Sequence, residues 1–282
     1  GKSTLLNRLI EQKISITSRK SQTTRNNILG IKTKDNYQMV FIDTPGVHIN
    51  ASKVMNKVLN QSALGAIEDA DLIIFMLQRN KINTLDELIL ERLKGIKTKK
   101  LCVINKLDQV ASKNSLLPVI EKLRSEYDFA EIIPVSAKTG KNINELENMI
   151  CQNLPENNHL YDSDTKFLAK ESFMISEIIR EKIIRFLGEE LPHETYVQLQ
   201  KLEDKENIIN IDAEIIVARE SQKGIVVGKN GAKLKKIGEK ARIDLEKFFN
   251  KKVFLKTWVK TKKNWNNDSD FISSLGIGSL YD

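Results

Sequence analysis

Three short apolar runs, each followed by a polar loop, constrain the fold of this chain more than any other feature. They cover residues 72–77, 101–104 and 132–135. A strand that is buried on both faces of a parallel sheet shows this continuous apolar pattern. Segments with the apolar spacing of helices lie between and beside the runs. Because strands that alternate with helices form doubly wound sheets, the first half of the chain is predicted to be an α/β domain.

The remaining elements of this α/β domain follow from the same spacing. Residues 28–33 and 38–43 are β-rich and flank a polar turn, which predicts a hairpin. The last helical pattern ends before Pro155, so the domain is predicted to cover residues 1–154. The predicted helices cover residues 4–12, 53–68, 84–93, 116–127 and 143–151.

The second half of the chain has a different pattern. A polar stretch at residues 155–165 is predicted to be a linker, and residues 166–282 are predicted to form a second domain. The order helix–strand–strand–helix–strand indicates an α+β arrangement, and a length of 282 residues fits two domains. Its elements are predicted at residues 167–187, 195–202, 208–218, 232–249 and 253–259.

Charge is concentrated in the second domain. Of the net charge of +8, residues 222–263 contribute 14 Lys or Arg against 3 Asp or Glu, while the rest of the chain is slightly acidic. Such a segment indicates a polyanion as partner, and the alternative is a solvated basic face. A hydrophobic content of 40% argues against disorder, and the apolar runs are too short to span a bilayer. With only Cys102 and Cys151, a disulfide framework is excluded and a reducing cytoplasm is expected.

The chain begins with the second half of a phosphate-binding loop, GxxxxGK[ST], in the sequence Gly1-Lys2-Ser3-Thr4. Apolar residues at helical spacing follow, so the motif is predicted at a helix N-terminus, where free N–H groups favour phosphate. Lys2 is expected to reach the β- and γ-phosphates of a nucleotide. The Ser3 hydroxyl is expected to bind Mg²⁺.

The predicted hairpin ends with Asp43-Thr44-Pro45-Gly46. An aspartate at the end of a strand can hold the hydration shell of Mg²⁺, so Asp43 is expected to bind the ion through water. The Gly46 amide is expected to meet the γ-phosphate, because a glycine lets the backbone approach closely. The alternative is a strand followed by an ordinary Pro-Gly turn.

The second apolar run in the parallel sheet leads into Asn105-Lys106-Leu107-Asp108, which fits the pattern NKxD. A carboxylate at Asp108 can accept hydrogen bonds from the ring N–H and the exocyclic amine of guanine. Adenine lacks this pattern and would leave the carboxylate unpaired. Asn105 is expected to brace the loop, and the stem of Lys106 is expected to pack over the base.

The third apolar run leads into Ser136-Ala137-Lys138, which is expected to present a backbone N–H to the guanine carbonyl. Each of these short sequences alone could be an ordinary loop after a strand. Together, in this order and at strand ends, they predict a binding site for guanine nucleotides, GTP and GDP, with Mg²⁺.

A polar loop at residues 18–25 lies between the first helix and the first strand. A threonine hydroxyl in such a loop can bind Mg²⁺ only while the γ-phosphate is present, which makes the loop a switch. Thr24, directly before Arg25, is the predicted ligand, and Thr23 is the alternative.

A second loop, Gly228-Lys229-Asn230-Gly231, lies between two helical stretches and precedes the basic helix 232–249. A GxxG loop in this setting clamps the backbone of single-stranded nucleic acid in KH modules, and the alternative is a plain turn. The residues expected to contact RNA are Gly228, Lys229, Asn230, Gly231, Lys233 and Lys236. The aromatic residues nearby are expected to pack inside the domain rather than to stack on bases; they are Phe248, Phe249, Trp258 and Trp265.

Taken in order, these motifs resemble those of the Era-type GTPases over nearly the whole chain. They include Gln22-Thr23-Thr24-Arg25 as well as the segment 176–182. The resemblance implies a P-loop GTPase sheet followed by an α+β type II KH domain. It implies a GTP-hydrolysing switch that binds small-subunit ribosomal RNA and assists assembly of the small ribosomal subunit. It further implies a monomer with peripheral association with the inner membrane.

The chain departs from this family at its N-terminus. Family members carry a strand and the first half of the P-loop before the residue that matches Gly1, so a fragment or a misassigned start is expected. Val47, after Asp-Thr-Pro-Gly, has no polar group to orient water, so no catalytic residue is assigned and turnover is expected to be slow. The alternatives are a catalytically dead fragment that only binds RNA, and a related translation or tRNA-modification GTPase.

Overall fold

The computed structural model describes residues 1–17, 24–47, 53–187 and 194–277. The chain divides into two compact units. Within the described residues, no helix is both long enough and apolar enough to cross a bilayer. The first unit comprises Gly1–Ser15, Ile28–Asp43 and Leu64–Leu168, and the second comprises Ile16–Asn27, Thr44–Ala63 and Ala169–Asp282.

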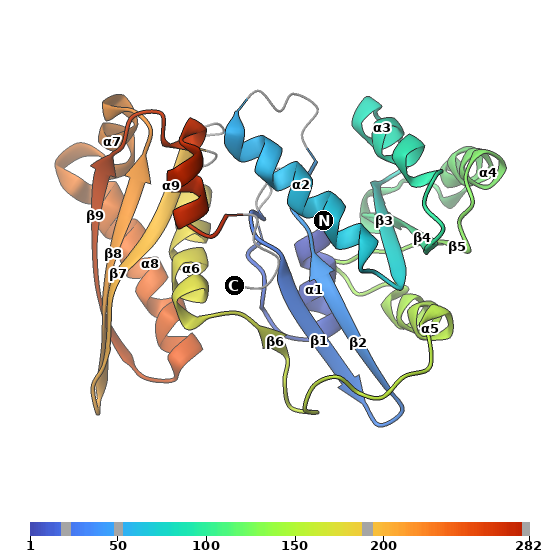
Figure 1. Ribbon diagram of the computed structural model, residues 1–282, viewed down its shortest axis with the longest axis horizontal. Helices are drawn as coiled ribbons and strands as arrows, with labels where there is room; N and C mark the ends of the chain where they lie inside the picture. Colours follow the sequence, from blue (N-terminus) through green and yellow to red (C-terminus); the bar gives the residue numbers. More distant parts are fainter. Residues whose placement is uncertain (18–23, 48–52, 188–193, 278–282) are drawn as a thin grey trace. The chain divides into compact units, whose positions relative to one another are not determined.

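The predicted hairpin is confirmed in the first unit. Strands β1 (Ile28–Lys34) and β2 (Tyr37–Asp43) pair antiparallel (Figure 1). On its other side β1 pairs with β6 (Phe167–Leu168), where a helix beginning at residue 167 was predicted. That prediction was wrong at its start, because two apolar residues in a row fit a strand as well as a helix. These two residues pair with the free edge of β1, and the helix begins only at Glu171.

The first unit also contains a parallel sheet. Its order is β3-β4-β5, from strands β3 (Leu72–Gln78), β4 (Lys99–Asn105) and β5 (Glu131–Pro134). Alternate residues of β4 face two different apolar cores, which explains its continuous apolar sequence. Burial also raises the pKa of the Cys102 thiol in β4 to about 12, as expected for an inert cysteine.

Helices cover both faces of this parallel sheet. The core on one face contains residues of α1 (Lys2–Ile10) and α5 (Ile143–Asn153). The core on the other face contains residues of α3 (Thr84–Leu93) and α4 (Leu117–Glu126). The predicted doubly wound α/β class is therefore confirmed.

The second unit contains a three-stranded sheet of order β7-β8-β9, in which β7 and β8 are antiparallel and β8 and β9 are parallel. Helices α6 and α8 lie against one face of it (Figure 1), and their apolar residues share a core with β8 and with Val226 of α7. The predicted helix–strand–strand–helix–strand elements are all present, and one helix that was not among the predicted elements, α7, lies between β8 and α8. The elements are α6 (Glu171–Phe186), β7 (Thr195–Asp204), β8 (Ile208–Val217), α7 (Glu220–Val227), α8 (Ala232–Phe249) and β9 (Lys252–Thr261).

Two short elements after β9 were not predicted, η5 (Trp265–Asn267) and α9 (Ser269–Ser274). They form a smaller core with Ile216 of β8 and with the start of α2 (Val54–Glu68). Trp265 is fully buried in this core and donates a hydrogen bond to the Glu194 carbonyl at 3.0 Å. It is therefore a packing residue, as predicted.

The segment just before β1 is also held in the second unit. The guanidinium of Arg25 lies 5.9 Å from the centre of the Trp265 ring and donates a hydrogen bond of 2.6 Å to the Thr195 carbonyl. Burial, followed by the nearby charge of Arg180, lowers the pKa of Arg25 to about 9. Asn26 donates to the Gly276 carbonyl at 2.9 Å. These contacts explain why residues 24–27 belong to the second unit rather than to the first.

Candidate functional site

The Gly-Lys-Ser sequence begins helix α1, as predicted. Gly1 is the N-cap, and Lys2 is exposed as the first helical residue. A Cβ atom at Gly1 would lie 2.9 Å from the Met76 sulfur and 3.2 Å from Nδ2 of Asn105. The N-terminus of α1, with Ser3 and Thr4 in its first turn, therefore lies close to the side chains at the carboxyl ends of β3 and β4, and a larger residue at Gly1 would displace them.

Asn105 fastens two of the predicted loops together. It is buried at the end of β4, and its Oδ1 accepts hydrogen bonds from the backbone N–H groups of Lys106, at 2.7 Å, and Ala137, at 3.0 Å. Lys106 has a left-handed backbone with φ of 67°, which the first of these bonds supports. The structure thus brings NKxD and Ser136-Ala137-Lys138 side by side, and Asn105 has the bracing role that the sequence predicted.

Asp108 lies on the exposed side of the same loop pair and is held by the buried Ser136. The Ser136 hydroxyl donates to Oδ1 of Asp108 at 2.6 Å. This hydrogen bond lowers the pKa of the Asp108 carboxyl below its usual value, so the group is fully ionised at neutral pH. Asp108 is exposed, and it therefore presents a negative acceptor to a ligand from solvent.

Arg8 is a site residue that the sequence analysis missed. It lies on α1, and its guanidinium donates to the Ala137 carbonyl at 3.3 Å and to the Lys138 carbonyl at 2.7 Å. One helix therefore offers its N-terminus at Gly1 and holds the 136–138 loop two turns later. The only signal in the sequence was a basic residue six positions after Lys2, which is common on helices.

Asp43 ends β2 and is buried, and its Oδ2 accepts a hydrogen bond of 2.9 Å from the Ser15 hydroxyl. In the described part of the chain, no three His, Cys, Asp or Glu side chains gather at a point. The donor set still fits Mg²⁺, which keeps several waters and needs only one or two carboxylates alongside phosphate oxygens. Thr24, Thr44, Pro45 and Gly46 belong to the second unit, and Thr23 lies outside the described residues.

The GxxG loop joins α7 to α8, as predicted, and three of its four residues have positive φ angles. Gly228, Asn230 and Gly231 have φ values of 72°, 50° and 76°. A Cβ atom at Gly228 would lie 2.7 Å from Cβ and 3.2 Å from the backbone nitrogen of Lys233, whereas the space around Gly231 is open. Gly228 is therefore required for the close turn onto α8.

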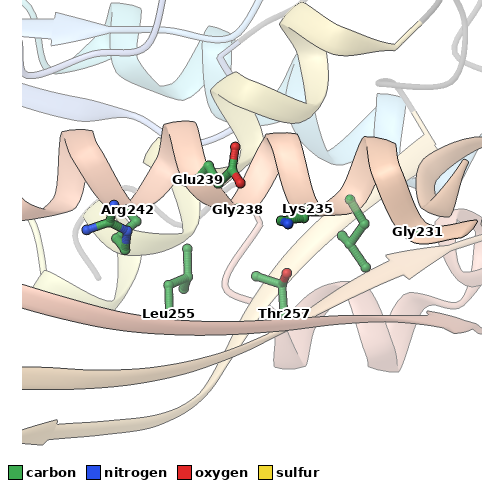
Figure 2. A pocket seen from close by; sticks show the side chains of 8 residues that line it. Gly231, Lys235, Gly238, Glu239, Arg242, Leu255 and Thr257 are labelled. Carbon is green, nitrogen blue, oxygen red and sulfur yellow. The ribbon is translucent and has the colours of Figure 1, made fainter.

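A groove of about 410 Å³ begins at this loop and runs between α8 and β9 (Figure 2). We call it the α8–β9 groove. Lys235 and Arg242 supply positive charge to it, and neither was predicted as a site residue. Gly231, Lys235, Gly238 and Arg242 have the spacing of one helix face, a signal that was present in the sequence. The groove is lined by Gly231, Leu234, Lys235, Gly238, Glu239, Arg242, Leu255 and Thr257.

The two lysines that were predicted on α8 lie elsewhere. The ammonium of Lys236 lies 5.3 Å from the centre of the Phe186 ring of α6, which is not among the groove residues. Lys233 packs against Gly228 at the start of the helix. Of the three consecutive positions 234 to 236, it is Leu234 and Lys235 that face the groove.

Comparison with known proteins agrees with both halves of this description. A family model described as a 50S ribosome-binding GTPase matches residues 1–106, and a KH domain model matches residues 190–266. The chain is 46% identical over 277 residues to the GTPase Era of Coxiella burnetii, covering 98% of this chain and 94% of that protein. The chain belongs to the Era family of GTPases. GTPase Era of Haemophilus influenzae is also 46% identical, covering 98% and 92%.

Solved structures of Era share the fold over nearly the whole chain. One is a variant of Aquifex aeolicus Era bound to GDP and AlF4⁻, with a TM-score of 0.94 and 34% identity. Another is Era in complex with MgGDPNP and nucleotides 1506–1542 of 16S ribosomal RNA, with a TM-score of 0.94 and 35% identity. Each alignment covers 98% of this chain and 94% of the other. The Era likeness therefore covers both the NKxD loop pair and the α8–β9 groove.

Proposed function

We propose that this protein is a GTP-hydrolysing switch that binds small-subunit ribosomal RNA through its C-terminal domain and assists small-subunit assembly. The observation that supports it best is the pair of loops at the ends of β4 and β5, joined by Asn105, beside the N-terminus of α1. This arrangement presents a carboxylate for guanine and free amides for phosphate in one unit. A protein that only binds RNA does not require this arrangement of loops.

In this proposal, guanine is recognised by the two loops. Asp108 accepts from the ring N–H and the exocyclic amine, and an amide of the segment Ser136, Ala137 and Lys138 donates to the guanine carbonyl. Asn105 holds the two loops at one separation. The Lys106 stem covers the base. Adenine would leave the ionised Asp108 carboxylate without donors, which is the costly form of mismatch.

The phosphates are held at the start of α1. The amides of Gly1, Lys2, Ser3 and Thr4 point toward the anion, and the Lys2 ammonium meets the β- and γ-phosphates. We assign Mg²⁺, which neutralises charge on those phosphates, to the hydroxyls of Ser3 and Thr24 and, through water, to Asp43. Ser15 holds the Asp43 carboxylate by its hydrogen bond and is a positioning residue in this scheme.

The segment Thr44-Pro45-Gly46 is assigned to the γ-phosphate, through the Gly46 amide. Val47 follows it and has no group that can orient water, so no residue of the chain is assigned as catalytic. Hydrolysis by the protein alone is therefore slow in this proposal, and a potassium ion, an activator or the RNA completes the site.

The RNA site is assigned to the GxxG loop and the α8–β9 groove. Gly228, Lys229, Asn230 and Gly231 clamp the backbone. Lys235 and Arg242 supply positive charge within the groove, and Lys233 and Lys236 add positive charge on α8 outside it. One matching family model is described as binding the 50S subunit, whereas the solved Era complex that matches the whole chain contains 16S RNA. We follow the complex, because it covers the KH unit as well as the GTPase unit.

The direct test uses nucleotide and RNA binding together. Equilibrium titration should show GTP and GDP binding with a preference over ATP of at least about a thousandfold. Fluorescence anisotropy should show binding of an RNA with nucleotides 1506–1542 of 16S ribosomal RNA, and release of phosphate from GTP should be accelerated by potassium ions, an activator or that RNA. Equal affinity for ATP and GTP would overturn the nucleotide assignment. Unchanged RNA affinity in the double variant Lys235→Gln with Arg242→Gln would overturn the groove assignment.

Three further assignments rest on the Era likeness. We propose a domain division into residues 1–154, a linker at 155–165, and a KH-type domain at 166–282, consistent with the two matching family models. We propose a cytoplasmic monomer with peripheral association with the inner membrane. Analytical ultracentrifugation and flotation with vesicles of bacterial lipid test the last two.

A further inference from the structure

Strand β9 carries a regular pattern on the side that faces away from the helices. Strand residues alternate between faces. Val253 and Val259 are buried in the core beneath the helices, and Leu255 and Thr257 line the α8–β9 groove. The residues between them point to the opposite face and alternate between lysine and aromatic. We call this set the outer stripe; it consists of Lys252, Phe254, Lys256, Trp258 and Lys260.

The aromatic members of the outer stripe are accessible. Phe254 is 56% exposed, although it is a large apolar side chain on a regular strand. Trp258 is half-buried, and its Nε1 donates to Oε1 of Glu214 at 2.9 Å, which fixes the position of the indole. It differs from Phe248 and Phe249, which pack against the core as predicted. Trp258 was predicted to pack inside the domain, but it is half-buried on the face of the sheet that points away from the helical core.

On this face the positive charges lie on β9 and the negative charges lie on β8. The edge strand β9 carries lysines only, and its neighbour β8 places Asn210, Asp212 and Glu214 beside Phe254, Lys256 and Trp258. Lys260 lies 3.7 Å from Glu214, and the Lys256 ammonium lies 5.8 Å from the centre of the Trp258 ring. A polyanionic backbone is therefore attracted to the edge of the sheet and repelled from its middle.

We propose that the outer stripe is a second contact site for single-stranded RNA, on which bases stack. It rests on the proposed function, since β9 forms one wall of the α8–β9 groove with its other face. Because β8 is the only strand that pairs with β9 among the described residues, the free edge of β9 separates the groove from the stripe by the width of one strand. An RNA strand that leaves the groove passes over this edge onto Phe254 and Trp258.

The chemistry of the stripe favours RNA over a protein partner. Interfaces with proteins are depleted in lysine, whereas proteins that bind single strands combine aromatic platforms with basic side chains. Phe254 and Trp258 are four residues apart, or about 13 Å along the strand, so each ring can take its own base. The stripe adds contact length beyond the roughly four nucleotides that a GxxG loop clamps.

The test compares a short RNA of about five nucleotides, which the groove alone holds, with one of about twelve. In fluorescence anisotropy, Phe254→Leu should weaken binding of the long RNA about tenfold, because it removes the aromatic face but keeps an apolar side chain. Binding of the short RNA should stay unchanged. Phe254→Tyr is the matched control and should bind both RNAs as the unaltered protein does. Thermal melting of each variant checks the fold.

Two further measurements sharpen the result. Changing Lys252, Lys256 and Lys260 to Gln should flatten the log–log salt dependence for the long RNA by about 2, at about 0.7 per phosphate. The protein has two tryptophans, and Trp265 is fully buried, so quenching by acrylamide reports on Trp258. The long RNA should protect Trp258 from acrylamide, and the short RNA should not.

The variants distinguish failure of the outer stripe from failure of the groove assignment. If Phe254→Leu binds the long RNA normally while Lys235→Gln with Arg242→Gln weakens both RNAs, the outer stripe is not an RNA site and the groove assignment stands. If the groove variant also binds both RNAs normally, the groove assignment fails as well. If the unaltered protein binds neither RNA, the proposed RNA function fails.

Discussion

The two recognition loops of this protein are held in different ways. The NKxD loop pair is fastened by side chains: Asn105 binds two backbone amides, Ser136 binds Asp108, and Arg8 binds two carbonyls. Helix α8 has no side-chain N-cap where the GxxG loop enters it, and the path of the loop depends on the backbone angles of Gly228 and Gly231.

This difference matches what each loop recognises. A base edge is read by donors and acceptors at fixed positions, so the protein must hold a carboxylate and an amide at one separation. A phosphate backbone is uniform along its length, so bare amides and nearby positive charge are sufficient. Rigid placement is therefore needed at one loop and close approach at the other.

The largest effect is expected at the fixed loop. Asp108→Asn should lower GTP affinity by about a thousandfold, because an amide cannot accept from both donors of guanine. It should favour xanthosine triphosphate, whose carbonyl replaces the amine. Competition against a fluorescent GDP analogue measures both. An unchanged preference for GTP over xanthosine triphosphate would show that Asp108 does not contact the base.

At the GxxG loop, charge rather than hydrogen-bond pattern should decide binding. Replacing Lys229 and Asn230 with Asp should weaken single-stranded RNA binding by about a hundredfold, because carboxylates would face phosphates at the start of α8. Fluorescence anisotropy over a salt series is the measurement, and circular dichroism is the folding control. Normal affinity in a folded variant would mean that the loop is only a turn.

A smaller effect is expected from Arg8, which touches no ligand in the proposed scheme. Arg8→Met should weaken GDP binding about tenfold, because the carbonyls of Ala137 and Lys138 lose their donors and the loop loosens. The ratio of GDP to IDP affinity should not change, since Asp108 reads the amine that distinguishes them. A change in that ratio would place Arg8 in contact with the base. Arg8→Lys should restore part of the loss.

The smallest effect is expected at Gly231, where φ is positive but no protein atom lies near the position of a Cβ. Gly231→Asn should change the melting temperature of the protein little, because asparagine tolerates the left-handed region and no protein atom lies near a Cβ there. Thermal melting is the measurement. Gly228→Asn is the matched contrast and should disrupt the loop, because its Cβ would collide with Lys233. Equal behaviour of the two variants would mean that glycine serves only to permit the backbone angles.

Most elements were predictable because their signals are local. The apolar runs of β3, β4 and β5 and the polar sequences after them lie within a few residues of each other, and they placed Asn105, Asp108 and Ser136 correctly at strand ends. Strand β6 was missed because only its pairing with β1, far away in sequence, makes it a strand.

The missed site residues share a related cause. Arg8 and Ser15 act by binding a carbonyl and a carboxylate that lie far from them in sequence, and nothing in their own neighbourhood marks them. Lys235 and Arg242 are different: their spacing on α8 was visible, but the face that they share could be identified only once β9 formed the opposite wall. The density of basic residues identified the region, but only the packing of α8 against β9 shows which of its lysines face the groove.

The burial of Trp265 has a consequence for how this chain can be shortened. Its indole covers one end of the outer face of β8, together with Phe271 and Ile272. A chain that ended after β9 would retain the sheet and the GxxG loop but would leave Ile216 and Tyr196 uncovered as an apolar patch. Such a shortened KH unit would be prone to self-association, and a C-terminal boundary beyond Ile277 preserves the cover.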